Sequence, residues 1–98
     1  MAKIVWTRLA LEDFEAIINY IRRDSDRYAE LFAKKILSSV RLLEFMPESG
    51  RITPEIEKSN IRELIVGIYR IIYRTHESRV DILTIRHGAR LFTLSDLI

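Results

Sequence analysis

The stretch 61–74, IRELIVGIYRIIYR, decides the fold of this 98-residue chain. β-Branched and aromatic residues dominate it on both sides of Gly67, and such residues are enriched in β-strands. A connection this short forces the runs 61–66 and 68–74 to pair as antiparallel strands, because a parallel crossover needs about a dozen residues. A third run, 79–86, follows four polar residues and extends the prediction to a three-stranded antiparallel meander.

Upstream of these strands, the hydrophobic pattern changes to a helical period. Apolar residues three and four apart predict an amphipathic helix over about residues 8–23, with Thr7 as its N-cap. A second stripe predicts a helix from about Arg27 to Phe45, which ends before Pro47 because a proline disfavours helical geometry in the residue before it. The short link between the helices predicts an antiparallel helix hairpin.

The remaining segments complete a single domain, residues 1–98. The opening run 3–6, KIVW, predicts a strand that joins an edge of the sheet. Residues 47–60 hold both prolines and one of the three glycines, which is typical of a connecting loop. The predicted fold is an α+β two-layer sandwich of order β-α-α-β-β-β, in which the helix hairpin packs on one face of a small antiparallel sheet.

Composition excludes several classes of protein. The aliphatic and aromatic share of 48% argues against a disordered chain, and a formal net charge of +2 argues against a general nucleic-acid or membrane binder. Without cysteine and with two histidines, the sequence predicts no metal site, and it contains no glycine-rich loop for a nucleotide cofactor. It also lacks a signal peptide and any apolar run near the roughly 18 residues of a membrane span. We therefore expect a cytoplasmic protein without cofactors.

Arginine outnumbers lysine twelve to four, and arginine is suited to bidentate contacts with carboxylate or phosphate. Strand alternation separates Tyr69 and Tyr73, interpreted as core residues, from Arg70 and Arg74 on the opposite face. The same rule, applied to the last strand, divides it into two sets: Val80, Ile82, Thr84 and Arg86 against Asp81, Leu83, Ile85 and His87.

Two interpretations of the strand arginines remain open. In the first, Arg70 and Arg74 are solvated or pair with Glu63 and Asp81, because a buried unpaired charge is very costly. In the second, a positive strip lies on the face that the helices leave uncovered and receives an acidic peptide or a phosphate. The residues of that strip are Arg62, Arg70, Arg86 and Arg90.

His87 follows the last strand and precedes Gly88 and Arg90. A histidine in this position is a candidate general acid or base for phosphoryl chemistry. The alternative is a strand-end histidine that is hydrogen-bonded to the backbone. His76 is expected to lie exposed in a turn, and Trp6 is interpreted as a packing anchor.

Four segments, in order, match motifs of one family. Trp6 to Ile21 resembles its first helix, 43–51 its L-x-x-x-P-x-x-G-R loop, 61–74 its R-E-L-x-x-G-x-Y-R-I-x-Y stretch, and 82–90 its strand ending in H-G-x-R. The chain is therefore similar, over nearly its full length, to the RelE/ParE toxin superfamily of bacterial type II toxin–antitoxin systems. The resemblance implies the β-α-α-β-β-β fold that the residue patterns predict independently.

The resemblance also implies two alternative activities. ParE-like members poison DNA gyrase by binding, whereas RelE-like members are metal-independent endoribonucleases that cleave mRNA on the ribosome. Trp6, the long helix hairpin and the P-x-x-G-R loop are closer to the ParE-like branch, which favours a gyrase inhibitor that is not an enzyme. The ribonuclease alternative would use Arg70, His87 and Arg90. Arg62 and Glu63 stand where that branch often has lysines, and no tyrosine follows Arg90.

On either branch, the resemblance implies a cognate partner. This partner is a ParD-like antitoxin with an acidic C-terminal segment, bound in a toxin–antitoxin hetero-oligomer. The target is DNA gyrase, or alternatively the ribosome, and a further alternative is a non-toxic corepressor that only binds antitoxin. The apolar tail 91–98 could dock on the sheet or on a partner. The expected contact residues for antitoxin or target are Arg62, Arg70, Arg74, Arg86 and Arg90.

Overall fold

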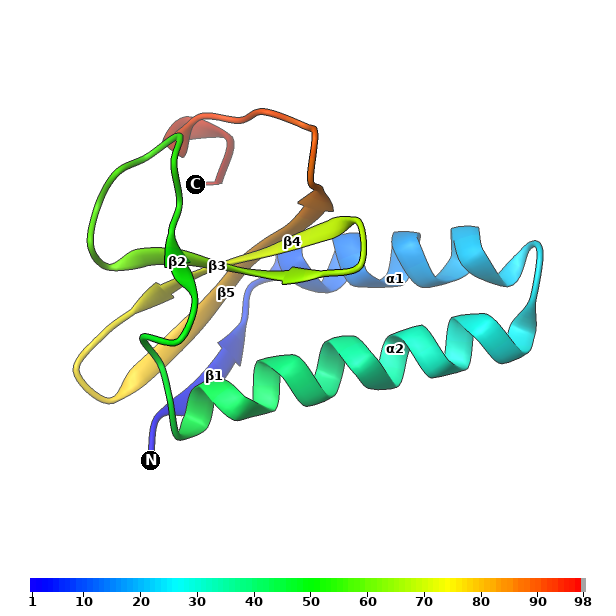
Figure 1. The fold of residues 1–98 in the computed structure, drawn as a ribbon, viewed down its shortest axis with the longest axis horizontal. Helices are drawn as coiled ribbons and strands as arrows, with labels where there is room; N and C mark the ends of the chain where they lie inside the picture. The colour runs from blue at the N-terminus through cyan, green and yellow to red at the C-terminus, as the bar shows by residue number, and fades with distance from the viewer. Residues whose placement is uncertain (98) are drawn as a thin grey trace.

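A five-stranded sheet of order β1-β5-β4-β3-β2 carries two long helices on one face in the computed structural model, which describes residues 1–97 (Figure 1). The predicted meander is confirmed, since β4 pairs antiparallel with both β3 and β5. The predicted edge strand is also present, but β1 pairs with β5 in parallel, so the sheet as a whole is mixed and only its other strands pair antiparallel. The strands are β1 (Lys3–Trp6), β2 (Arg51–Ile52), β3 (Ile61–Val66), β4 (Tyr69–Thr75) and β5 (Arg79–His87).

The helix hairpin consists of α1 (Arg8–Arg22) and α2 (Asp26–Arg41). Thr7 caps α1 as predicted, since its hydroxyl oxygen accepts a hydrogen bond from the Ala10 N–H at 3.1 Å. The α-helical part of the second helix ends at Arg41, earlier than predicted, and the chain tightens into a 3₁₀ turn over Leu42–Glu44. No helix within residues 1–97 has both the length and the apolar character to cross a membrane.

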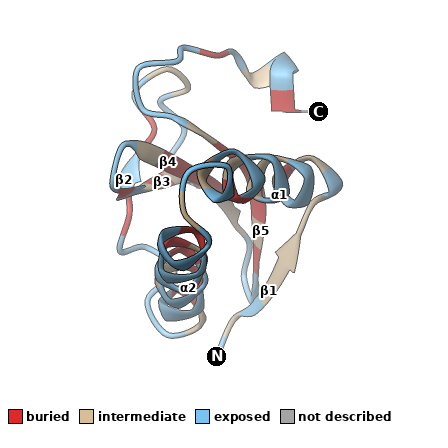
Figure 2. Ribbon diagram, turned by 90° about the vertical axis from the view of Figure 1, so that its right-hand side faces the viewer, coloured by how far each residue is buried: buried red, intermediate tan, exposed pale blue. Residues whose placement is uncertain are grey.

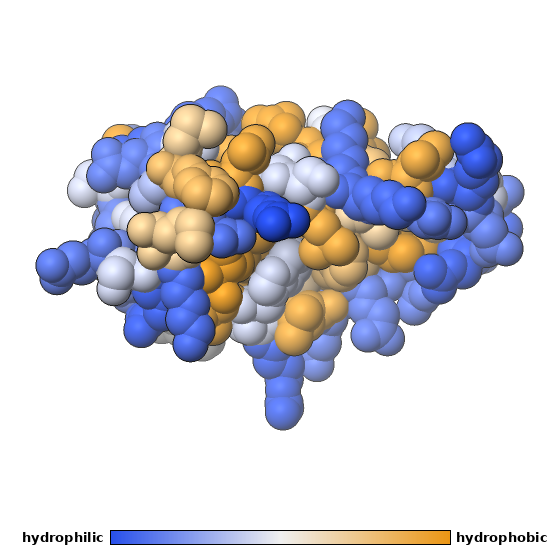
Figure 3. Space-filling model, turned by 90° about the horizontal axis from the view of Figure 1, so that it is seen from below, coloured by the Kyte–Doolittle hydropathy of each residue, from blue (hydrophilic) through white to orange (hydrophobic). Residues whose placement is uncertain are grey.

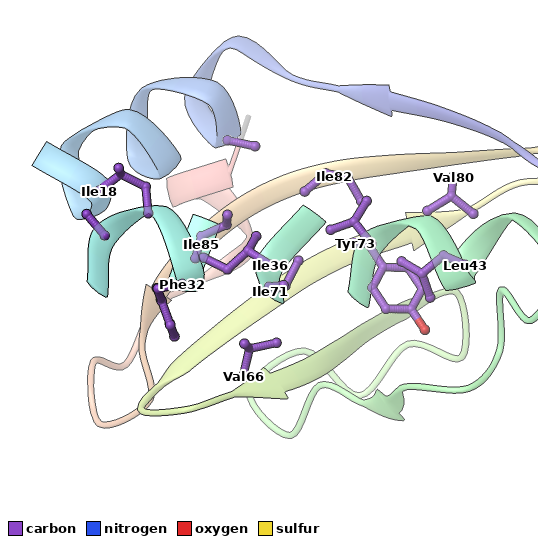
Figure 4. Close-up of a cluster of buried hydrophobic side chains, with 13 residues drawn as sticks. Ile18, Phe32, Ile36, Leu43, Val66, Ile71, Tyr73, Val80, Ile82 and Ile85 are labelled. Atoms are coloured by element: carbon purple, nitrogen blue, oxygen red, sulfur yellow. The ribbon is translucent and has the colours of Figure 1, made fainter. Parts of the chain in front are cut away.

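The main core lies between the helix hairpin and the sheet (Figure 4). Its buried members are Ala10, Ile18, Ala29, Phe32, Ile36, Val40, Leu43, Val66, Ile71, Tyr73, Val80, Ile82 and Ile85. Tyr69 and Trp6 pack against this cluster, which confirms their interpretation as core residues. On the α2 side of the molecule, apolar side chains still reach the surface between charged ones (Figure 3).

Tyr73 is fully buried in this core, and its hydroxyl oxygen accepts a hydrogen bond from the Gly50 N–H at 2.9 Å. Burial raises the pKa of Tyr73, so the phenol stays protonated at neutral pH. A Cβ atom at position 50 would lie only 2.6 Å from the Tyr73 hydroxyl oxygen. Glycine is therefore required at the point where this loop meets the sheet.

The opposite face of the sheet, called the outer face below, carries a second and smaller apolar cluster. Its buried members are Ile61, Ile72, Leu83, Phe92 and Leu97. Ile56 from the β2–β3 loop and Leu94 from the C-terminal segment pack against it, and this segment crosses the sheet on the side away from α2 (Figures 1 and 2). The tail therefore docks on the sheet through Phe92, Leu94 and Leu97, whereas Leu91 stays exposed and Ile98 lies outside the described residues.

The short strand β2 is a feature that the sequence did not predict. It lies inside the segment interpreted as a loop, and Arg51 and Ile52 pair with Glu63 and Arg62 of β3. Two residues are too few to show an alternating pattern, so only backbone pairing identifies them as a strand. The sheet has five strands within residues 1–97, and β2 forms the edge beside β3.

A bulge in β5 corrects the predicted division of that strand between its faces. Ile72 pairs with Thr84 and Tyr73 with Ile82, so Leu83 has no partner across the ladder. An extra residue reverses the alternation beyond it. Consequently Ile85 joins Val80 and Ile82 on the helix side, while Leu83 packs on the outer face, and the predicted strict alternation is wrong.

Candidate functional site

Arg70 lies at the centre of the outer face and is only 4% exposed. Its Nη1 and Nη2 atoms donate to the two carboxylate oxygens of Glu55, at 2.9 and 2.6 Å. Its Nη1 atom also donates to Glu63 Oε1 at 3.1 Å. A fork-shaped guanidinium facing a carboxylate in this way forms the strong, bidentate kind of ion pair.

Glu63 extends the pair into a network of alternating charges. Its carboxylate is fully buried, and its Oε2 atom accepts from Arg51, 2.6 Å from Nη2 and 2.7 Å from Nε. The order Arg51–Glu63–Arg70–Glu55 contains two positive and two negative groups, so the network is neutral. The hydrogen bond from Arg70 lowers the pKa of Glu55, and the bond to Glu55 in turn raises the pKa of Arg70. Both groups therefore stay ionised at neutral pH.

The C-terminal segment meets the same arginine. Arg70 Nη2 donates to the carbonyl oxygen of Arg90 at 2.8 Å. The guanidinium groups of Arg70 and Arg86 lie 5.0 and 5.4 Å from the centre of the Phe92 ring. These distances are typical of cation–π contacts. Arg70 therefore joins strand β4, the β2–β3 loop and the tail at one point.

This geometry corrects the prediction of an open positive strip on the outer face. Arg70 is walled in by Glu55 and Glu63, and its pairing with Glu63 confirms the alternative interpretation. Arg62 does not share its face: it pairs with Tyr73 across β3–β4, and its Nη1 donates to the Gly50 carbonyl oxygen at 2.9 Å. The physical reason is that the chain's own loop and tail cover the outer face.

The other predicted arginine pair, between Arg74 and Asp81, does not form. Asp81, proposed as the partner of Arg74, is bonded instead to Arg79 at 2.9 Å and to His76 at 2.8 Å. Burial alone would raise the pKa of Asp81, but these two hydrogen bonds outweigh it and the pKa is lowered. His76 lies exposed in a turn, as expected. Arg74 and Arg86 are half-buried, and Arg90 is exposed.

The structure does not bring together the three residues proposed for the ribonuclease alternative. His87 lies exposed at the end of β5, with its ring edge-on to Tyr69 at 6.2 Å. Its Nδ1 atom accepts a hydrogen bond from the Ala89 N–H at 3.1 Å, which confirms the interpretation as a backbone-bonded strand-end histidine. Tyr69 belongs to the helix side, whereas the Arg70 guanidinium lies against Phe92 on the outer face. His87 and Arg70 therefore point away from each other.

Sequence reasoning missed Glu55 and the position of Phe92. Glu55 lies in an irregular loop, 15 residues before Arg70, where no periodic pattern indicates a direction. The clearest sequence signal was Arg70 itself, since an arginine in an otherwise apolar strand must either reach solvent or pair with an acid. Within residues 1–97, no three histidine, aspartate or glutamate side chains group together so as to hold a metal ion.

A shallow apolar hollow lies where the tip of the helix hairpin faces the β3–β4 turn. Tyr20, Tyr28 and Ile68 line it and are each more than half exposed. The guanidinium of Arg23 lies 5.7 Å from the centre of the Tyr20 ring. The hollow is therefore an apolar surface with a positive charge at its margin, a combination that suits an amphipathic acidic segment.

Comparison with known proteins places these features in a family context. Residues 4–92 match the family model described as ParE toxin of type II toxin-antitoxin system, parDE. Toxin RelE2 of Caulobacter vibrioides is 38% identical over 92 residues, which cover 93% of this chain and all of that protein. The solved structure of a chromosomal ParDE TA system from P. aeruginosa has the same fold, with a TM-score of 0.72 over 89% of this chain and 96% of that one at 24% identity.

Proposed function

Because this chain belongs to the ParE toxin family and is a toxin of a type II toxin–antitoxin system, we propose that it inhibits DNA gyrase by binding and not by catalysis. The observation that carries this proposal is the closure of Arg70 by Glu55 and Glu63. The family resemblance offers two targets, gyrase and the ribosome, and only the second requires a catalytic site.

A ribonuclease must stabilise a crowded phosphate and move protons at the same place. It needs fixed positive charge together with a general base and a general acid, all within reach of one phosphate. In this chain both Nη atoms of Arg70 are bonded to the protein's own carboxylates, and His87 lies toward the other face. This arrangement favours an activity that depends on surface recognition alone.

We further infer that a ParD-like antitoxin neutralises the toxin by covering its accessible cationic and apolar surface. Arg74, Arg86 and Arg90 remain at least partly exposed and would pair with acidic residues of the antitoxin. The hollow beside Tyr20 and Ile68 would receive its apolar residues. A disordered acidic segment that folds on this surface would cover the regions that a target must contact.

The proposal is tested with purified gyrase, supercoiled plasmid and this protein. We expect cleaved DNA–gyrase complexes to accumulate, and a stoichiometric amount of the cognate antitoxin to prevent this. His87→Ala should act like the unaltered protein, since no proton transfer is involved. Unchanged supercoiling at micromolar protein would contradict the proposal.

A ribosome-dependent ribonuclease is the second candidate, and one observation favours it. His87 and Arg90 lie together and exposed in the strand-end turn, where the Arg90 N–H donates to the His87 carbonyl oxygen at 3.0 Å. Primer extension on translating mRNA distinguishes the two candidates: cleavage that disappears with His87→Ala would establish the ribonuclease. Normal growth of cells that express the chain alone would instead indicate a non-toxic corepressor.

A further inference from the structure

The β2–β3 loop closes over Arg70 through one carboxylate. We propose that residues 53–60 form a latch, in which Glu55 occupies a carboxylate-binding site on Arg70 that an acidic residue of a partner protein takes over when the loop opens. This inference shares the Arg70–Glu55 pair with the proposed function, but it is tested on the loop alone, without gyrase or the ribosome, so that the failure of one can be told from the failure of the other.

The receptor half of this site is built into the sheet. Arg70 is held in β4 and Glu63 in the neighbouring strand β3, and Glu63 keeps its contact with Arg70 Nη1 without help from the loop. Phe92 packs against the same guanidinium. The Arg70 fork therefore remains oriented when Glu55 leaves, and an oriented fork loses little freedom on binding a new carboxylate.

Departure of Glu55 also changes the local charge. The closed network is neutral, whereas Arg51, Glu63 and Arg70 without Glu55 carry a net charge of +1. Arg86 lies on the same Phe92 ring and adds to the positive field. The open site therefore attracts an anion, and Glu55 itself shows that a carboxylate fits the fork.

The closed loop carries unfavourable features that make opening accessible. Glu57 has a φ of 57°, in the left-handed region that residues other than glycine rarely adopt. Within residues 1–97, neither Thr53 Oγ1 nor Arg70 Nε has a hydrogen-bond partner, although both atoms are buried. Backbone hydrogen bonds hold the two ends of the loop, from the Thr53 N–H to the Ile61 carbonyl oxygen at 3.0 Å and from the Thr75 N–H to the Asn60 carbonyl oxygen at 2.8 Å. Between these ends only Glu55 and Ile56 are partly buried, so the ion pair of Glu55 is the main polar attachment of the middle of the loop.

Hydrogen exchange tests the latch in the full chain. Replacing Glu55→Gln removes the charge of the latch, and we expect amides of the loop to exchange about tenfold faster, since a hydrogen bond to a charged group is lost. Glu57→Gln is the matched control, because it removes an equal charge from the same loop at an exposed position. Equal exchange in the two variants, or acceleration spread evenly over β4 and β5, would overturn the latch.

A peptide tests the receptor half. The synthetic peptide TPEIEK, residues 53–58, is added at millimolar concentration to the Glu55→Gln variant while the NMR signal of the Arg70 Nε–H is followed. We expect this signal to shift, and to shift much less in the unaltered protein, whose own Glu55 occupies the site. The same peptide with Gln in place of Glu55 should leave it unchanged. No shift with TPEIEK, or equal shifts with both peptides, would overturn the proposal.

Discussion

The two faces of the sheet are both covered, but by different means. Ile71 and Ile72 are neighbours in β4 and both are fully buried, yet Ile71 packs under two capped helices and Ile72 under an irregular loop and a tail. The helix side is stabilised by a large and almost wholly apolar cluster. The outer face depends on a smaller cluster and on an arginine that joins three segments. Residues that are equally buried on the two faces are therefore covered by segments that are attached to the sheet with different strength.

A pair of matched phenylalanine substitutions is expected to show the largest contrast. Phe32, on α2, and Phe92, in the tail, are similarly buried at 7% and 5% exposure. Phe32→Ala leaves a cavity that the helices cannot close, and we expect a loss of about 4 kcal/mol in the free energy of unfolding. Phe92→Ala should cost only about 2 kcal/mol, because the tail can detach without disturbing the rest.

Urea denaturation followed by circular dichroism measures both free energies of unfolding. The comparison also predicts where the damage appears. Phe92→Ala should increase proteolysis of the tail at unchanged cleavage elsewhere, whereas Phe32→Ala should expose the whole chain. Equal losses of stability for the two variants would mean that the faces are not attached differently.

The ion-pair network offers a second contrast, of intermediate size. Glu63→Gln leaves Arg70 buried with one of its two carboxylates gone, and breaking a buried pair in this way costs about 3 kcal/mol. The double substitution Glu63→Leu with Arg70→Met replaces the charges by apolar groups of similar size. We expect it to be less destabilised than the single variant, because the two most deeply buried charges are removed together, while Glu55 belongs to a loop that can turn its carboxylate to water.

Chemical denaturation of both variants measures this ordering. If the double variant is the more stable of the two, as expected, the ion-pair network positions the loop and the tail and contributes less to the stability of the fold. A double variant at least as unstable as Glu63→Gln would instead make the charges themselves a main source of stability.

The same contrast explains which parts of the fold were predictable. The helix side follows from repeated local patterns: the helical stripe that contains Phe32 and the strand alternation that contains Ile71 and Tyr73. The outer face depends on contacts that have no period. Glu55 reaches Arg70 from an irregular loop, and the bulge at Leu83 reverses the faces of β5.

The candidate site was predictable in part. An arginine inside an apolar strand must reach solvent or pair with an acid, and Glu63 was one of the partners considered for Arg70. The pairing of Glu63 with Arg70 also predicts the direction of Arg62. Neighbouring residues in a strand point to opposite faces, so if Glu63 lies on the outer face with Arg70, Arg62 lies on the helix side. The position of Phe92 between Arg70 and Arg86 depends on where the tail folds back, which no local pattern encodes.

The smallest expected effect is a pH dependence that isolates the latch. The pKa of Glu55 is lowered in the folded chain from its ordinary value of 4.5, chiefly by the hydrogen bond from Arg70. A lowered folded-state pKa stabilises the fold above the unfolded value and loses that effect as the pH falls through the folded value. Glu55→Gln should thus cost about 1 kcal/mol at pH 7 and progressively less below pH 4.5. Urea titrations from pH 7 to pH 3 measure the difference in free energy of unfolding between the unaltered protein and Glu55→Gln. If that difference did not change with pH, or if Glu57→Gln showed the same difference, the charge of Glu55 would not be what attaches the loop.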